Sequence, residues 1–261
     1  MAWKYPPKEG IIVDSKVVVE NKDEVAIVRI NRPQVLNALD RETKKLLLDS
    51  FLRLGDDAQV KAIVLTGTGD RAFCSGQDIK ESVDLAGDSA SDWVAEFDHM
   101  YQSIRQCPKP VVASVRGYAA GSGFQLALLA DLRVASSDAR FAMTEIDVGI
   151  PCITGSTLLW PLLGRARTLE LILTGSFLSA EEALAWGVAT EVVDGDPLGR
   201  AMEVAQSLAG KATRAIRLNK RWINELTEEV YQRGVAFAKA AHGEAYASGD
   251  AAEHMQRFLN R

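Results

Sequence analysis

Two glycine-containing segments of this sequence could bind a ligand through their main-chain N–H groups. They are residues 72–79 and 117–125, and each follows a run of apolar residues typical of a strand. Glycine at a strand-to-helix turn lets main-chain N–H groups approach a ligand closely. The second segment leads directly into an apolar helical pattern, and a helix N-terminus adds unpaired donors and a positive dipole. Both segments are therefore candidate binding loops whose donors come from the backbone.

Glu145 is the ionisable residue with the most suggestive surroundings. It follows Phe141-Ala142-Met143-Thr144 and precedes Gly149-Ile150-Pro151. A single carboxylate can remove a proton from one carbon atom and return it to another. Asp147 is the alternative second acid: in an extended segment its side chain would share a face with Glu145, whereas in a turn it would not.

The histidines and cysteines of the sequence indicate neither a metal site nor a disulfide framework. None of them has another metal-ligand type at a suggestive spacing, and the cysteines are odd in number and without a CxxC pair. We interpret the histidines as surface or tail residues and the cysteines as small apolar fillers, with Cys152 the one nearest to Glu145. These residues are His99, His242 and His254, and Cys74, Cys107 and Cys152.

The loops need strands and helices to position them. Strands are expected at residues 11–13, 16–20, 25–30, 61–66, 110–115, 132–135, 140–143 and 190–193. Helices are expected from a cap at Asp40 to about residue 54, and at residues 92–106, 123–130, 169–174, 179–186 and 198–209. The recurring strand, helix, strand order indicates right-handed crossover units. We therefore expect an α/β core to about residue 200 and a helix-rich segment at residues 212–261.

The bulk composition favours a globular protein of the cytoplasm. The chain has 261 residues, 47% of them apolar, which is enough for one large domain or one domain with a helical appendage. No apolar run approaches the roughly 20 residues needed to cross a bilayer, and the N-terminus does not resemble a secretion signal. The net charge of −5 disfavours nucleic-acid binding. We expect no membrane and no nucleic-acid partner.

A set of motifs, in order along nearly the whole chain, resembles the crotonase (enoyl-CoA hydratase/isomerase) family. The motifs are Asn31-Arg32-Pro33 with Asn37-Ala38-Leu39, Phe73-Cys74-Ser75-Gly76-Gln77-Asp78, Lys109-Pro110-Val111-Val112-Ala113, Gly117-Tyr118-Ala119-Ala120-Gly121-Ser122-Gly123, Phe141 to Pro151, Leu173-Thr174-Gly175 and Ala183-Leu184-Ala185-Trp186-Gly187-Val188-Ala189. Each motif alone is weak, but their order over such a distance makes a strong match.

The resemblance implies a fold, an assembly and a substrate class. The fold would be α/β, a crotonase-like spiral of ββα units (residues 1–200) with a C-terminal helical region (residues 201–261) that forms trimers or pairs of trimers. The apolar residues Trp222, Ile223, Leu226, Val230 and Phe237 of that region would pack on the core or on a neighbouring subunit. The substrate would be an acyl-CoA thioester, and no further cofactor is needed because CoA is part of the substrate.

The resemblance also implies roles for individual residues. The main-chain N–H groups of Gln77 and Ser122 would form an oxyanion hole for the thioester oxygen, which stabilises an enolate as charge develops. The other residues expected to bind substrate or CoA are Val35, Ala38, Ser75, Asp78, Ile79, Gly121, Thr144 and Val148. No metal is implied.

One departure from the family pattern bears on the mechanism. Hydratases of this family commonly use two glutamates, which would fall at Gln125 and Glu145. Glutamine cannot exchange protons near neutral pH, although it can orient water or substrate by hydrogen bonds. Glu145 alone as acid/base favours isomerisation or a specialised lyase or hydratase reaction.

Two other functions remain open. One is a thioester or β-diketone C–C hydrolase of the same fold; the other is a non-catalytic RNA- or ligand-binding homologue, which the net acidity disfavours. Cys152 and Ile153 would narrow the acyl pocket, as would Phe124 and Trp160 if they face inward.

Overall fold

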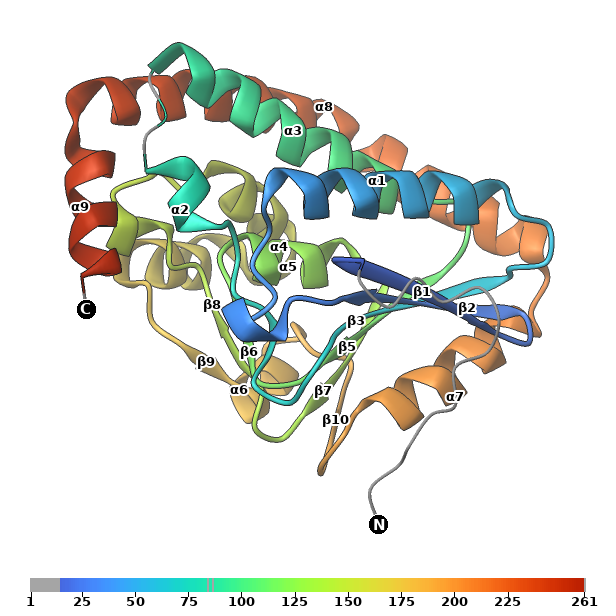
Figure 1. Cartoon of the computed structure of the whole chain (residues 1–261). Helices are drawn as coiled ribbons and strands as arrows, with labels where there is room; N and C mark the ends of the chain where they lie inside the picture. The colour runs from blue at the N-terminus through green and yellow to red at the C-terminus, as the bar shows by residue number, and fades with distance from the viewer. Residues whose placement is uncertain (1–14, 84, 86, 261) are drawn as a thin grey trace.

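Two β-sheets, formed by the described residues, make the centre of the molecule (Figure 1). The computed structural model describes residues 15–83, 85 and 87–260, so the strand expected at residues 11–13 lies outside the described residues. The larger sheet has the strand order β1-β2-β3-β5-β7-β10, and the smaller sheet has the order β4-β6-β8-β9. The bounds are β1 Val17–Lys22, β2 Val25–Ile30, β3 Ala62–Gly67, β4 Ala72–Cys74, β5 Val111–Val115, β6 Tyr118–Ala120, β7 Leu132–Ser136, β8 Arg140–Ala142, β9 Leu178–Ser179 and β10 Glu191–Val193.

Successive turns of the chain place one strand in each sheet and then a helix. β3 and β4 precede α2 and α3, β5 and β6 precede α4, and β7 and β8 precede η2 and α5. β3, β5 and β7 pair in parallel in the larger sheet, as β4, β6 and β8 do in the smaller one. The helix bounds are α2 Ile79–Ser82, α3 Gly87–Arg105, α4 Ser122–Leu129, η2 Glu145–Val148 and α5 Ile153–Thr174. The spiral of ββα units is therefore confirmed.

Of the four strands that the described residues form in the smaller sheet, only β8 was predicted, at residues 140–143; β4, β6 and β9 were not. β4 and β6 have three residues each and lie inside the two segments that the sequence indicated as loops. Three residues are too few to show an alternating pattern, and the glycines beside them favour a loop assignment. The loops that remain for binding are shorter, and each is anchored by a strand at its start.

Helices cover both faces of the larger sheet. Ile63 and Leu65 of β3 belong to the same apolar cluster as α1 (Arg41–Asp56) and α3, whereas Val64 packs with α7 (Leu198–Ala209) on the other face. This two-sided burial explains the continuous apolar run in β3. Asp40 caps α1 as predicted, since its carboxylate accepts a hydrogen bond of 2.8 Å from the main-chain N–H of Thr43.

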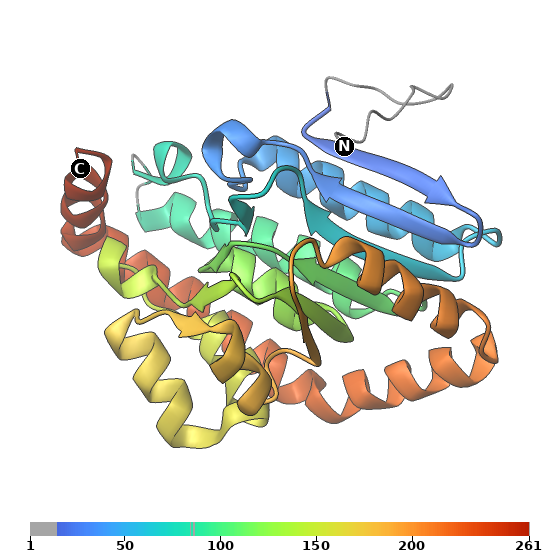
Figure 2. The same cartoon turned by 90° about the horizontal axis from the view of Figure 1, so that it is seen from below.

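The C-terminal helices pack on the spiral (Figures 1 and 2). α8 (Thr213–Ser248) lies along α3 and contacts α5, and α9 (Asp250–Leu259) packs against η2. The buried guanidinium of Arg105 fastens α3 to α8 by donating to the carbonyl of Asn224 (2.9 Å) and the hydroxyl of Thr227 (2.8 Å). The expected boundary at residue 200 falls inside α7, which packs on the sheet; the division into core and tail stays a prediction.

The apolar stripe of α8 does not pack on the chain's own core. Its five residues are each 58% to 62% exposed: Trp222, Ile223, Leu226, Val230 and Phe237. Of the two alternatives drawn from the sequence, packing on the core is wrong for these side chains. No helix in the described part of the chain has the length and apolar character needed to cross a membrane.

Candidate active site

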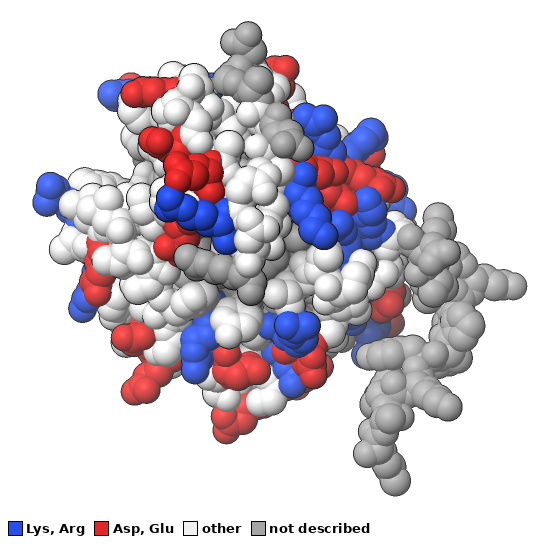
Figure 3. All heavy atoms as spheres, turned by 60° about the vertical axis from the view of Figure 1, so that its left-hand side comes forward, with Lys and Arg blue, Asp and Glu red and all other residues white. Residues whose placement is uncertain are grey.

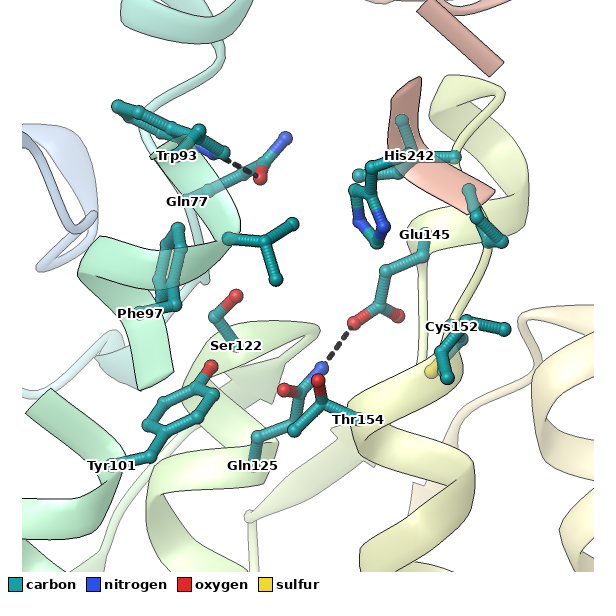
Figure 4. A pocket seen from close by; sticks show the side chains of 14 residues that line it. Gln77, Trp93, Phe97, Tyr101, Ser122, Gln125, Glu145, Cys152, Thr154 and His242 are labelled. Carbon is teal, nitrogen blue, oxygen red and sulfur yellow. Dashed lines mark hydrogen bonds between the residues drawn. The ribbon is translucent and has the colours of Figure 1, made fainter. Parts of the chain in front are cut away.

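A cavity of about 610 Å³ opens between the two glycine-containing segments and leads to Glu145. It is also lined by η1 (Pro33–Val35), η2 and the end of α9. A second cavity of about 40 Å³ lies beyond Glu145, between α3, α4, α5 and α8 (Figure 4). Gln77, Ser122, Glu145 and Ile150 line both cavities. A ligand in the large cavity could therefore extend past Glu145 into the small one.

The main chains of the two segments approach each other closely. Gly76 has a φ of +99° and Gly121 a φ of +51°, conformations that side chains disfavour. A Cβ atom on Gly76 would lie 2.8 Å from the carbonyl oxygen of Ala120 and 3.3 Å from the amide nitrogen of Ser122. The glycine at position 76 is what allows the first segment to lie against the start of α4.

The amides of Gln77 and Ser122 are not used by the secondary structure. Leu39 bonds to the carbonyl of Gly76 (2.8 Å) and to the amide of Asp78 (3.0 Å), so the amide of Gln77 between them points the opposite way. Ser122 begins α4, and the first N–H groups of a helix have no intrahelical acceptor. Neither amide donates to a main-chain acceptor in the described ranges.

Side chains near the N-terminus hold the first segment in place. Asn37 accepts from the amide of Arg32 (3.0 Å) and donates to the carbonyls of Thr68 (3.0 Å) and Ala72 (2.8 Å). The guanidinium of Arg32 pairs with the carboxylate of Asp78 (3.1 Å), which also caps α2. Asp78, expected to bind substrate, therefore has its side chain engaged in structural contacts.

The side chain of Gln77 ties the segment to two helices. Its amide oxygen accepts from the indole N–H of Trp93 on α3 (3.2 Å), and its amide nitrogen donates to the hydroxyl of Ser82 on α2 (3.2 Å). These two hydrogen bonds hold the side chain of Gln77 against the helices, and its main-chain N–H has no main-chain acceptor among the described residues.

Glu145 presents a buried carboxylate to both cavities (Figure 4). The residue is 7% exposed, and Oε1 accepts a hydrogen bond of 2.6 Å from the side-chain amide of Gln125. No described residue forms a hydrogen bond of standard geometry with Oε2, although the weakly donating thiol of Cys152 lies close to the carboxylate. Burial raises the pKa of Glu145, against the opposite effect of hydrogen bonds from its own main-chain amide, Cys152 and Gln125. A raised pKa brings proton uptake and release closer to neutral pH.

Gln125 orients this carboxylate and does not add a second one. Both oxygens of an ionised carboxylate are acceptors, so the amide nitrogen of Gln125 must face Glu145. The structure thus brings together the two positions at which the family commonly has glutamates. At these two positions, therefore, only Glu145 has a side chain that can exchange protons near neutral pH.

The structure places the eight expected substrate-binding residues on the wall of the large cavity. They are Val35, Ala38, Ser75, Asp78, Ile79, Gly121, Thr144 and Val148. The same wall includes residues that sequence reasoning missed: Arg71, Lys80, Tyr118, Phe177, Phe258 and Leu259. The cations next to the first segment had a signal, namely their position beside a candidate binding loop. Phe258 and Leu259 had no such signal, because only the packing of α9 against η2 brings them near the cavity.

His242 lies in the helical tail, as the sequence interpretation allowed, but its side chain lines a cavity beside Glu145, which the sequence did not indicate. It lies on α8 and lines the small cavity, opposite Tyr101 of α3 (Figure 4). Its Nδ1 lies 2.8 Å from the carbonyl of Ala238, which can only accept, so Nδ1 carries the proton. Burial lowers the pKa of His242, which keeps the ring neutral near pH 7. The sequence could not show that α8 folds back over the site.

The structure agrees with some of the other expectations about the pocket walls and disagrees with the rest. Cys152 and Ile153 line the small cavity as predicted. Phe124 instead packs against Phe141 in the core, and Trp160 is 52% exposed, so neither narrows the pocket. The segment is a 3₁₀ turn (η2) that exposes Asp147 and buries Glu145, although both residues line the large cavity. The extended alternative for that segment is wrong.

The fold and the sequence both match known proteins. The chain superimposes on the crystal structure of an enoyl-CoA hydratase/isomerase from Mycobacterium paratuberculosis with a TM-score of 0.87 and 26% identity, over 93% of this chain and 98% of the other. The architecture is therefore that of the crotonase fold.

Residues 20–261 match the family model described as enoyl-CoA hydratase/isomerase. The chain belongs to this family, the crotonases, and is an enzyme of the hydratase/isomerase type.

Two relatives illustrate the range of the family. The chain is 32% identical over 249 residues to a short-chain-enoyl-CoA hydratase of Clostridium acetobutylicum, covering 95% of each. It is 30% identical over 247 residues to an (E)-benzylidenesuccinyl-CoA hydratase of Thauera aromatica, covering 94% of this chain and 96% of the relative. Similar identities to relatives with such different acyl groups leave the acyl group to be argued from the site.

Proposed function

We propose that the protein binds an acyl-CoA thioester and stabilises its enolate between the main-chain N–H groups of Gln77 and Ser122. The observation that carries this proposal is that these two free amides and the carboxylate of Glu145 lie around one cavity. Two preorganised donors aimed at a thioester oxygen stabilise negative charge as it develops there. The carbon next to the thioester then becomes acidic enough for a nearby carboxylate to deprotonate.

Glu145 serves as the single acid/base in this proposal. Its Oε2 is buried and makes no hydrogen bond of standard geometry in the described part of the chain, so it can accept a proton from the substrate. Gln125 holds Oε1 and cannot activate a second group by proton transfer. This division of roles favours isomerisation, or a specialised lyase or hydratase reaction, over hydration by two glutamates.

The large cavity supports CoA as the carrier of the acyl group. Its volume of about 610 Å³ is in the range of small-molecule sites. Arg71 and Lys80 on its wall can pair with phosphate groups, and the exposed rings of Tyr118 and Phe177 offer apolar surface. We propose no other cofactor, because enolate chemistry on a thioester needs only donors and a base.

Other features of the chain support a cytoplasmic enzyme without a nucleic-acid partner. Basic and acidic side chains are interspersed on the face shown in Figure 3, which offers no continuous basic stripe there. The cysteines Cys74, Cys107 and Cys152 are buried and unpaired, as is usual in a reducing compartment. We also propose that the site works without a metal; within the described ranges no group of three or more His, Cys, Asp or Glu residues could hold one.

Incubation with a panel of CoA esters in deuterated water tests the function. We expect one or more of the 2-enoyl, 3-enoyl, 3-oxoacyl or alicyclic esters to gain deuterium at the carbon next to the thioester, or to be converted, as followed by mass spectrometry. Free CoA or a ring-opened acid would indicate the hydrolase alternative. Binding of RNA without exchange in any ester would contradict an enzyme of this mechanism.

We also propose that the helical region after residue 200 assembles the protein as a homotrimer or a dimer of trimers. The exposed apolar stripe of α8 needs a partner surface, since large apolar patches on a monomer are uncommon. Light scattering is expected to give three or six times the mass of one chain. Replacing Trp222 and Leu226 together with glutamate should lower this mass, and a monomeric wild-type protein would contradict the proposal.

A further inference from the structure

The small cavity beyond Glu145 contains a buried hydroxyl group without a well-formed hydrogen bond. Tyr101 on α3 is 2% exposed, and its Oη makes no hydrogen bond of good geometry to any described residue, although the hydroxyl of Ser122 lies close enough to interact with it. Figure 4 shows this hydroxyl directed into the cavity, beside Ser122. Burial raises the pKa of Tyr101 well above its ordinary value, so the group stays protonated and can donate. A buried hydroxyl without a partner is costly, which indicates that a ligand or water completes it.

The opposite wall of the cavity offers an acceptor. Because Nδ1 of His242 donates to its own helix, Nε2 has a free lone pair at the far end of the ring. No described residue donates a hydrogen bond to Nε2. Thr154 of α5 adds a hydroxyl elsewhere in the lining, beside Gln125 (Figure 4). The cavity therefore pairs a free donor with a free acceptor.

Charge and size restrict what can occupy this cavity. Its described lining includes no lysine or arginine, and it includes the carboxylate of Glu145. An anionic group would be repelled and would lose its hydration without compensation. The volume of about 40 Å³ exceeds the roughly 10–15 Å³ that one water needs, but holds only a few heavy atoms. The rings of Trp93 and Phe97 close the side toward α3.

We propose that this cavity selects a short acyl group that carries an uncharged oxygen substituent, with Tyr101 as its hydrogen-bond donor and His242 as its acceptor. A hydroxyl group can satisfy either partner, since it can accept from Tyr101 or donate to His242, whereas a carbonyl oxygen can satisfy Tyr101 alone. A methyl group in the same place leaves the buried polar groups unpaired. The inference rests on the proposed function, because it assumes that the acyl group passes Glu145 to reach the cavity.

Two CoA esters of matched shape test the proposal. They are 4-hydroxybut-2-enoyl-CoA and pent-2-enoyl-CoA, which differ by a hydroxyl in place of a methyl group. We expect calorimetry to show about tenfold tighter binding of the hydroxy ester to the wild-type protein. Tyr101→Phe should remove most of this preference by weakening the hydroxy ester alone. Tyr231→Phe is the control, because Tyr231 is equally buried but donates to Asp98 (3.1 Å) outside the cavity.

Two outcomes of the binding measurements overturn the inference. The wild-type protein could prefer the methyl ester, or Tyr101→Phe could weaken both esters equally, which would make Tyr101 a structural residue. Deuterium exchange on the same samples reports the proposed function separately. Exchange without a preference for the hydroxy ester contradicts only the selection of acyl group, whereas a preference without exchange contradicts only the chemistry.

Discussion

Glu145→Gln is expected to lower turnover by about a thousandfold while leaving the binding of CoA esters nearly unchanged. The substitution keeps the shape of the side chain and an oxygen that can accept from Gln125, but removes the group that exchanges protons. Steady-state kinetics on the best ester of the panel, with calorimetry for binding, measures the effect. Glu203→Gln, the same change at an exposed carboxylate on α7, is the control and should be fully active.

The same variant should be at least as stable as the wild-type protein at neutral pH. Burial raises the pKa of Glu145 above its ordinary value of 4.5, so the folded protein favours the neutral acid. The stabilisation from this preference is complete below the unfolded pKa and is lost as the pH rises through the folded pKa. At pH 7 the ionised side chain therefore destabilises the fold, and glutamine avoids this cost.

Thermal unfolding of both proteins between pH 4 and pH 8 tests whether the ionised side chain of Glu145 destabilises the fold. The advantage of Glu145→Gln should shrink as the pH falls through the ordinary value of 4.5, below which Glu145 becomes neutral in both the folded and the unfolded chain. A variant that unfolds more easily at pH 7, or one that retains full turnover, would contradict the role given to Glu145.

The elements of the spiral could be predicted from the sequence because their signals are local. The apolar run of β3 and the cap at Asp40 each depend on a few neighbouring residues. The positions of Gln77, Ser122 and Glu145 followed from the ordered family motifs. Most of the smaller sheet could not be predicted, because its strands β4 and β6 have too few residues to show a pattern.

The two walls of the small cavity that come from α3 and α8 were also not predicted, and the physical reason is a different one. His242 and Tyr101 are far apart in the chain, and α8 must lie along α3 before they face each other. No local pattern encodes that packing, because a histidine on a helix looks the same whether the helix faces solvent or a site. The turn at η2 was equally hidden, since its residues permit both an extended and a turned backbone.

Gly76→Ala is expected to lower kcat by about a hundred- to a thousandfold, the usual cost of losing one oxyanion donor. The added Cβ would lie 2.8 Å from the carbonyl oxygen of Ala120, which is main chain and cannot rotate away. The two segments must therefore separate, and the amides of Gln77 and Ser122 would no longer be able to bind one oxygen atom together, as the proposed mechanism requires. The effect should fall on kcat more than on KM, because enolate charge develops only as the reaction proceeds.

The variant Gly187→Ala is a control that distinguishes the predicted loss of kcat in Gly76→Ala from an effect of backbone strain. Gly187 also has a positive φ, +77°, but a Cβ there would meet nothing within 4 Å. Both variants should lose about 1 kcal/mol or more of stability to the strained conformation, measured by urea unfolding. Only Gly76→Ala should lose activity, because only there does the new methyl group separate the two binding loops. A folded Gly76→Ala protein with normal kcat would mean that the thioester oxygen is bound elsewhere, and the proposed enolate mechanism would lose its donors.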